Sequence, residues 1–271
     1  MGEGRRRRER KYTIQFYSLL SFESFLKCIY SFFVQGIQEN LELLPQLYPG
    51  WIIRIYNDLE PGSVLHTDLC SLACTNPSLD LCYVKALPSS ADISRVFAMI
   101  WRFFPVLDPQ VDLYASRDLD SRINRREAAA VTAWLESPHH FHFMRDHPAH
   151  SIEILGSGWG VSLGVRESSV RSLMLEAFRE AAGDPLFWAP RDAYGPDQGF
   201  LKRYIWPWGK WSALSHDSYT CKRFPRTSPF PTQRENTENN FVAAVTEVKD
   251  VMRQECPVAC RPKNHKDWRL C

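Results

Sequence analysis

The chain has 271 residues, of which 44% are hydrophobic and 24% are charged. These values are typical of globular proteins and exclude a disordered, collagenous or coiled-coil chain. The net charge of +2 argues against a protein that binds nucleic acid, because such domains are usually much more basic. The length suits one large α/β domain or two small ones.

A basic arm opens the chain, and an aromatic, apolar stretch follows it. Residues 5–11 hold six Arg and Lys, and residues 12–34 are mostly apolar. A basic segment followed by an apolar one is similar to a signal anchor. However, Glu23 and Lys27 interrupt the apolar stretch. No uninterrupted part of it reaches the roughly 18 residues that a membrane-spanning helix needs. We expect residues 1–35 to form a degenerate first strand and helix, with a weak membrane anchor as the alternative. Any membrane contact is expected only here.

Hydrophobic periodicity and turn residues predict strands and helices that alternate along the chain. The expected strands are residues 51–56, 79–87, 111–115 and 141–144. The expected helices are residues 36–47, 91–104, a helix from about 125, residues 169–182 and a helix from about 197. Asn124 and Glu127 have the spacing of a capping box. Such alternation predicts an α/β fold, in which a mainly parallel sheet is sandwiched by helices and binds ligands at the carboxyl ends of its strands.

We predict three segments from these patterns. Residues 1–35 form the arm and the first unit, and residues 36–220 form the core of the domain. Residues 221–271 form a Pro-rich linker followed by a tail that contains cysteines, because Pro and polar residues dominate from about residue 220 to residue 240.

An acid pair follows the apolar strand 111–115. Asp118 and Asp120 are two residues apart, so an extended chain directs them to the same side. Two such carboxylates repel each other unless a cation lies between them. Mg²⁺ or Mn²⁺ is commonly held by one or two carboxylates together with substrate phosphates, and the flanking Arg117 and Arg122 are candidate phosphate contacts. The alternative is a pair of solvated acids that form ion pairs with these arginines.

The run V-D-L-Y-A-S-R-D-L-D-S, residues 111–121, resembles the D-x-D motif of GT-A-fold glycosyltransferases. Later motifs resemble an uncharacterised group of that superfamily; they are F-H-F-M-R-D-H at 141–147, I-L-G-S-G-W-G at 154–160, D-Q-G-F-L at 197–201 and H-D-S-Y at 216–219. The resemblance covers roughly residues 48–219. It implies a single GT-A-like domain that moves a sugar from a nucleotide-sugar donor to a carbohydrate or protein acceptor, with Mn²⁺ or Mg²⁺ as cofactor.

The resemblance also implies roles for individual residues. Asp118 and Asp120 match the pair that holds the metal and the diphosphate, and His216 resembles the late histidine that completes the metal site. Asp197 and Gln198 resemble the D-Q of glycogenin-like transferases. They are the catalytic candidates, with Asp197 orienting the sugar or acting as the base on the acceptor hydroxyl.

Two further stretches are candidates for substrate binding. Gly158, Trp159 and Gly160 resemble a loop that lines sugar pockets, where glycine allows close backbone approach and the indole face stacks on a sugar ring. Arg145, Asp146 and His147 follow a strand end and are expected at the rim of the cleft. Two departures stand against the resemblance: the first nucleotide-binding unit is altered, and Gly199 replaces the second acid of the D-Q motif.

Histidines and cysteines leave alternatives open. Five histidines between His139 and His150 match no zinc motif, whereas Cys256, Cys260, His265 and Cys271 resemble a zinc knuckle with longer spacings. In a secretory protein the cysteines would form disulfides, and in the cytoplasm they would be free thiols, so the compartment stays open. Two other functions compete with transfer. They are a catalytically inactive GT-A-fold binding protein and a zinc-knuckle protein that binds nucleic acid.

Overall fold

The computed structural model describes residues 12–15, 26–87, 93–164, 168–188, 195–224, 226–234, 240–245, 252 and 254–271. One eight-stranded sheet organises them, in the order β3-β2-β1-β4-β6-β5-β7-β8. The strands are β1 Tyr12–Gln15, β2 Trp51–Asn57, β3 Leu79–Tyr83, β4 Leu113–Ser116, β5 Phe141–Arg145, β6 Trp159–Ser162, β7 Ala213–Asp217 and β8 Thr227–Ser228. Only the pairs that include β6 are antiparallel among these strands, so the predicted mainly parallel α/β fold is confirmed.

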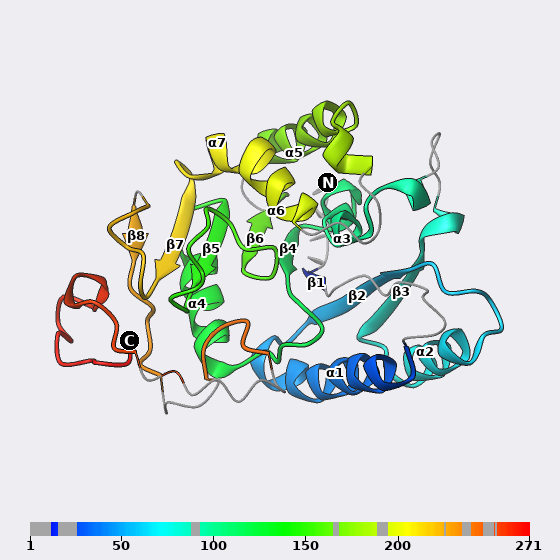
Figure 1. The fold of residues 1–271 in the computed structure, drawn as a ribbon, viewed down its shortest axis with the longest axis horizontal. Coiled ribbons are helices and arrows are strands. Elements are labelled where there is room, and N and C mark those ends of the chain that lie inside the picture. Colours follow the sequence, from blue (N-terminus) through cyan, green and yellow to red (C-terminus); the bar gives the residue numbers. More distant parts are fainter. Residues whose placement is uncertain are drawn as a thin grey trace, which may run out of the picture.

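Helices cover both faces of the sheet (Figure 1). The helices are α1 Leu26–Leu47, α2 Val64–Thr75, α3 Ala98–Trp101, α4 Arg125–Glu136, α5 Ser168–Ala181, α6 Pro196–Phe200 and α7 Trp206–Gly209. Helices α1, α2 and α4 share one buried apolar cluster with β2 and β4, whereas α3, α5 and α6 share another cluster on the opposite face. The sheet is therefore the middle layer of three.

The N-terminal segment contributes a central strand. β1 pairs in parallel with β2 on one side and with β4 on the other. Helix α1 then runs without a break across the expected boundary at residues 35/36, so this boundary does not separate two units of structure. The basic arm, residues 1–11, lies outside the described residues. No described helix is both long enough and apolar enough to cross a membrane.

Most predicted elements are present, but the expected helix 91–104 is wrong. Its described part forms a 3-10 turn at Ile93–Arg95, the four-residue α3 and a second 3-10 turn at Phe104–Leu107. Buried apolar side chains occur all around this segment rather than on one face, so it winds through the core. The predicted strand 79–87 likewise ends at Tyr83, where a 3-10 turn begins. Asn124 caps α4 as expected, because its side chain accepts a hydrogen bond from the Glu127 backbone N–H.

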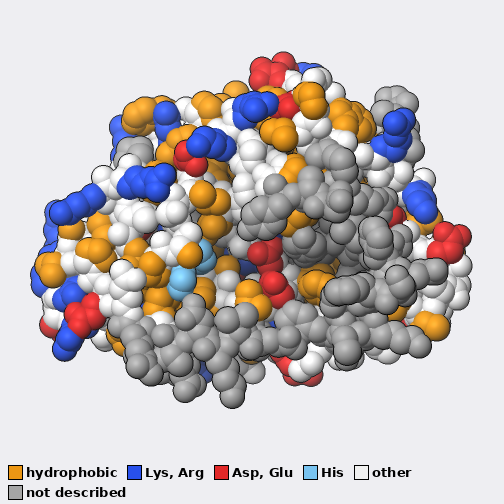
Figure 2. Space-filling view, viewed as in Figure 1, with side chains coloured by type: hydrophobic (Ala, Val, Ile, Leu, Met, Phe, Trp, Pro, Cys, Tyr) orange, Lys and Arg blue, Asp and Glu red, His pale blue; other side chains and the backbone are white. Residues whose placement is uncertain are grey.

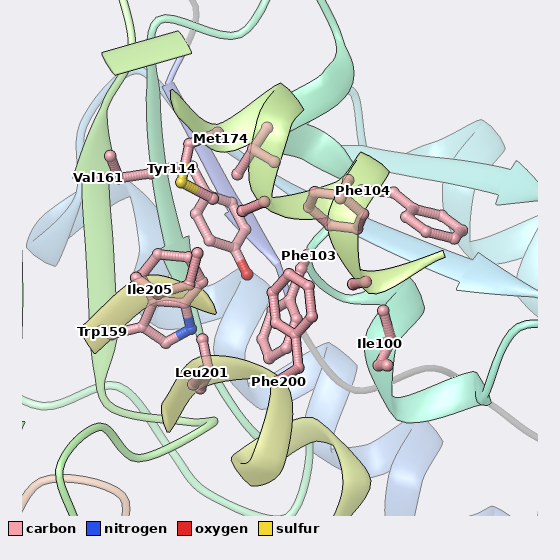
Figure 3. Close-up of a cluster of buried hydrophobic side chains, with 14 of the residues drawn as sticks. Ile100, Phe103, Phe104, Tyr114, Trp159, Val161, Met174, Phe200, Leu201 and Ile205 are labelled. Atoms are coloured by element: carbon pink, nitrogen blue, oxygen red, sulfur yellow. The ribbon is translucent and has the colours of Figure 1, made fainter. Parts of the chain in front are cut away.

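Aromatic rings fill the core on the α5 and α6 face (Figure 3). Phe103 lies in the middle of this group, with its ring 5.5 Å from that of Trp159 and 5.6 Å from that of Phe200, centroid to centroid. Tyr114 of β4 packs edge-on against Trp159 at 5.2 Å. Tyr114 lies in the strand that leads into the acid pair, and its hydroxyl donates a hydrogen bond to the Arg102 carbonyl oxygen at 2.8 Å, so this cluster anchors β4 and the segment that carries Arg102.

The C-terminal segment packs against the sheet instead of forming a detached tail. β8 extends the sheet beside β7, and disulfides join Cys221 to Cys260 and Cys256 to Cys271. Phe230 and Val242 lie in a buried cluster with residues of α4 and β5. The predicted boundary at 220/221 therefore marks no break in the packing. The zinc-knuckle hypothesis is wrong, since three of its four proposed ligands, Cys256, Cys260 and Cys271, are in disulfides.

Candidate functional site

A cavity of about 360 Å³ opens where β4 ends. β1 lies between β2 and β4, so the order of the strands reverses there, and ligands of open α/β sheets bind at the carboxyl ends of strands beside such a point. Acidic side chains lie in the hollow at the centre of this face (Figure 2). The cavity lining comprises Phe33, Met99, Arg102, Asp118, Leu119, Asp120, Gly195, Asp197 and Gln198.

The acid pair converges on this cavity, as the spacing predicts. Burial and the neighbouring Asp118 carboxylate raise the pKa of Asp120 to about 6. A tight turn holds the loop, because the backbone N–H and the hydroxyl of Ser121 both donate to the Asp118 carbonyl. Helix α1 passes so close that a Cβ at Gly36 would lie 2.3 Å from the Leu119 carbonyl oxygen, so only glycine fits there.

Arg102 links the two acidic parts of the cavity. Its Nη1 donates to Asp118 Oδ1 at 2.5 Å and its Nη2 donates to Asp197 Oδ2 at 3.1 Å. The side chain is buried, and its Nε donates to the Met99 carbonyl oxygen. Arg102 is not among the site residues that the sequence motifs predict. The available signal was a single charge within the apolar run 96–106, because an unpaired arginine is rarely found in a core.

Asp197 and Gln198 reach the same cavity from the first turn of α6. Gly195 precedes this turn with φ of 89°, a conformation that favours glycine. Burial raises the pKa of Asp197, while the charge of Arg102 opposes the rise. Gln198 Oε1 is buried and accepts no hydrogen bond from the described residues. The structure thus brings together four predicted site residues, Asp118, Asp120, Asp197 and Gln198.

The two arginines that flank the acid pair point elsewhere, which corrects their predicted role as phosphate contacts. Arg117 is buried and forms an ion pair with Glu127 of α4, whose carboxylate also accepts a hydrogen bond from the Tyr48 hydroxyl. Arg122 forms an ion pair with Glu39 of α1. Both arginines therefore fix the loop to the helices behind it rather than line the cavity.

The M-R-D-H residues also lie away from the cavity. Arg145 forms a buried ion pair with Asp217 at 2.7 Å, and Asp146 receives two hydrogen bonds from Arg126, each 2.8 Å long. The ring of His147 packs against Phe241 at 4.7 Å. These side chains therefore have structural roles, which corrects the expected substrate contacts. A buried charge needs an opposite charge; Arg145 finds it in Asp217, and Asp146 finds it in Arg126.

The glycine-and-tryptophan loop belongs to the core. Trp159 is fully buried, so its indole has no exposed face for a sugar. A Cβ at Gly158 would lie 2.8 Å from the Met144 carbonyl oxygen, and one at Gly160 would lie 2.8 Å from the Tyr114 carbonyl oxygen. The glycines therefore serve close packing of β6 between its neighbouring strands, which corrects the predicted sugar contacts.

His216 is separated from the acid pair. It lies in β7, where its Nδ1 is 2.8 Å from His142 Nε2 and its ring packs 5.3 Å from that of Phe230. Within the described ranges, no three His, Cys, Asp or Glu side chains are grouped so that they could hold a metal ion. Asp118, Asp120 and His216 therefore do not form the expected metal site, and the described histidines between 139 and 150 form no zinc site. Asp118 and Asp120 still fit a divalent cation that takes its other ligands from a substrate phosphate and water.

Acid should destabilise the fold through the buried histidine pair. Burial lowers the pKa of His142 and brings that of His216 to about 3. Both rings are neutral in the folded chain, and the unfolded chain binds protons below a pH of about 6.5. The resulting stability is complete above that pH and is lost as the pH falls toward about 3. We expect the free energy of unfolding to fall by about 2 kcal/mol for each of the two histidines, about 4 kcal/mol together, from about pH 7 to about pH 5.

Urea denaturation at the two pH values measures this fall. The His216→Gln variant, which has no titrating group at this position, should lose less stability over the same range. An equal fall in the variant and the wild-type chain would contradict the assignment.

Comparison with known proteins gives similarity in structure alone. No family model matches the chain, and no curated protein matches it. Similar solved structures include a glycosyltransferase involved in the glycosylation of the major capsid of PBCV-1, with 15% identity, a TM-score of 0.40 and coverage of 77% of this chain and 83% of that one. Another is the mannosyltransferase PcManGT from Pyrobaculum calidifontis in complex with GDP-Man and Mn²⁺, with 12% identity, a TM-score of 0.44 and coverage of 80% and 56%.

The bifunctional glycosyltransferase WbbM has 12% identity and a TM-score of 0.45, with coverage of 76% of this chain and 38% of that one. The chain thus spans about half of PcManGT and less of WbbM. All three are glycosyltransferases, the class that the sequence motifs resemble. Similarity at this level concerns architecture, and the activity has to be inferred from the site.

Proposed function

We propose that the chain is a metal-dependent glycosyltransferase that moves a sugar from a nucleotide-sugar donor to a carbohydrate or protein acceptor. One observation carries the proposal. Three carboxylates and a buried arginine converge on one cavity at the carboxyl end of β4, beside the point where the strand order reverses. A nucleoside diphosphate with its cation needs these groups, because carboxylates bind the metal and the metal binds the phosphates.

Each side chain has a role in this proposal. Asp118 and Asp120 would hold Mn²⁺ or Mg²⁺, and the bound ion would supply positive charge to the leaving diphosphate. Arg102 forms a bridge between this pair and Asp197, and so keeps the metal-binding and sugar-binding parts of the cavity in register. Asp197 and Gln198 contact the donor sugar. The raised pKa of Asp197 also suits a base that accepts a proton from the acceptor hydroxyl.

A panel of nucleotide sugars tests the proposal. The protein is incubated with each donor and Mn²⁺, and the release of nucleoside diphosphate is measured. We expect one donor to be hydrolysed or transferred in a metal-dependent reaction, and chelation of the metal to stop it. Absence of turnover with every donor would contradict catalysis.

A catalytically inactive binding protein of the same fold is the alternative that the departures from the family's sequence pattern raise. Calorimetric titration separates the two. A catalytic chain should bind UDP or GDP only when Mn²⁺ is present, because Asp118 and Asp120 contact the diphosphate through the metal. An inactive chain whose site has decayed should show no heat in either condition.

A further inference from the structure

A partly exposed tryptophan lies between two cations at the edge of the sheet. Trp211 follows α7 and has 55% of its surface exposed. Lys210 Nζ is 5.1 Å from the centre of its indole ring, and Arg226 Cζ is 5.5 Å from it. The Arg226 Nη1 also donates to the Trp211 carbonyl oxygen at 3.2 Å. The three side chains form one unit, which we call the Trp211 cluster.

The backbone at Arg226 is strained. Its φ of 54° lies in the left-handed region, which is unfavourable for a non-glycine residue. Strained residues persist where the surrounding structure holds them, and they are concentrated at binding sites. At this position the Arg226 side chain contacts the Trp211 indole and the Trp211 carbonyl oxygen.

Positive charge extends beyond the Trp211 cluster. Lys222 and Arg223 are exposed on the turn before β8, and Lys and Arg side chains gather over α7 and the starts of β7 and β8 (Figure 2). Lys202 and Arg203 on the preceding turn form ion pairs with Glu153 and Asp184. Lys210, Lys222, Arg223 and Arg226, by contrast, form no ion pair with a described carboxylate. Arg223 acts electrostatically on Glu153, and the charges of the other three are available to an anionic partner.

The Trp211 cluster lies at the opposite end of the strands from the cavity. β4 and β5 run in the same direction, because each is antiparallel to β6, and β7 and β8 run parallel to β5. Trp211 and Arg226 directly precede β7 and β8, so they lie at the edge of the sheet opposite to the end of β4. A partner bound at this edge leaves the cavity open to solution.

We propose that the Trp211 cluster, together with Lys222 and Arg223, docks the protein on an anionic membrane surface. Tryptophan is enriched at the level of lipid headgroups, where its ring is apolar and its N–H remains hydrated. Lys and Arg side chains near the membrane surface are attracted to anionic lipids. An exposed indole with Lys210 and Arg226 against its ring and further cations on the next turn fits this interface. Single-stranded RNA also stacks its bases on indoles, but the net charge of +2 argues against a protein that binds nucleic acid, and RNA is included in the test as the competing partner.

Vesicle co-sedimentation of the full chain tests the proposal. We expect binding to vesicles that contain phosphatidylserine and little binding to vesicles of phosphatidylcholine alone. The double variant Lys210→Glu/Arg226→Glu should bind at least about tenfold more weakly, since two cations are replaced by repelling anions. Trp211→Ala should weaken binding to the same vesicles at unchanged net charge.

The matched control is Lys85→Glu/Arg179→Glu, which makes the same change in net charge at exposed positions on the 3-10 turn after β3 and on α5. This variant leaves the Trp211 cluster, Lys222, Arg223 and the N-terminal arm unchanged, and it should bind the vesicles as the wild type does. Equal binding by the two double variants would overturn the proposal, and so would wild-type binding to RNA but not to vesicles. Circular dichroism verifies that each variant is folded.

Discussion

Replacing Asp120 by asparagine should reduce metal-dependent turnover by about 1,000-fold, because the metal's stabilisation of a leaving diphosphate amounts to several kcal/mol. The variant should remain folded. Burial and the Asp118 charge oppose ionisation of Asp120 in the folded chain, so a neutral amide relieves repulsion. We therefore expect a melting temperature equal to or above that of the wild type.

Turnover is measured with the donor that the nucleotide-sugar panel identifies, and binding of Mn²⁺ with nucleoside diphosphate is measured by calorimetry. Both should be lost together in Asp120→Asn. The control Asp267→Asn makes the same chemical change at an exposed position near the C-terminus and should leave both unchanged. Full turnover in Asp120→Asn would remove the metal assignment.

Replacing Glu127 by alanine should lower the free energy of unfolding by about 3–5 kcal/mol, because it leaves a buried charge without its partner. Glu127 and Arg117 are each 1% exposed, and the carboxylate also accepts the hydrogen bond of the Tyr48 hydroxyl, which is 2.8 Å away. The mutation therefore orphans an arginine and a tyrosine at once. Because Arg117 precedes Asp118, the acid pair should lose its fixed position as well.

Urea denaturation measures this effect. The matched control is Glu136→Ala, which lies at the exposed end of the same helix α4 and should change stability by about 0.5 kcal/mol or less. Glu127→Gln keeps the hydrogen-bond acceptor and separates the loss of charge from the loss of contact. A loss below about 1 kcal/mol in Glu127→Ala would contradict the role of this ion pair.

The acid pair could be predicted from sequence because its signal is local. Asp118 and Asp120 follow a strand by a few residues, and strand direction alone fixes where they point. The alternation of strands and helices likewise fixes the class of fold. Asp197 and Gln198 came from a motif resemblance, and the cavity that they share with the acid pair could not be derived from spacing.

The remaining site predictions failed where a partner is remote along the chain. Arg145 pairs with Asp217, 72 residues away, so an isolated strand-end motif looks like a free cluster of charge. Trp159 looked available because glycines flank it, yet those glycines only permit close strand packing. Such residues are distinguished by burial, which depends on the complete tertiary structure.

The position of β1 has a consequence for how the chain folds. Its first partner, β2, is translated soon after it, but its second partner, β4, pairs Leu113 with Tyr12 and emerges about one hundred residues later. Until β4 is made, one side of β1 has unpaired N–H and C=O groups. Another chain can form β-sheet hydrogen bonds with these groups. Formation of such long-range pairs is slow because the intervening loop must close first. A newly made chain therefore passes through a period of risk for aggregation, and β4 ends it by the same pairing that places the acid pair beside the cavity.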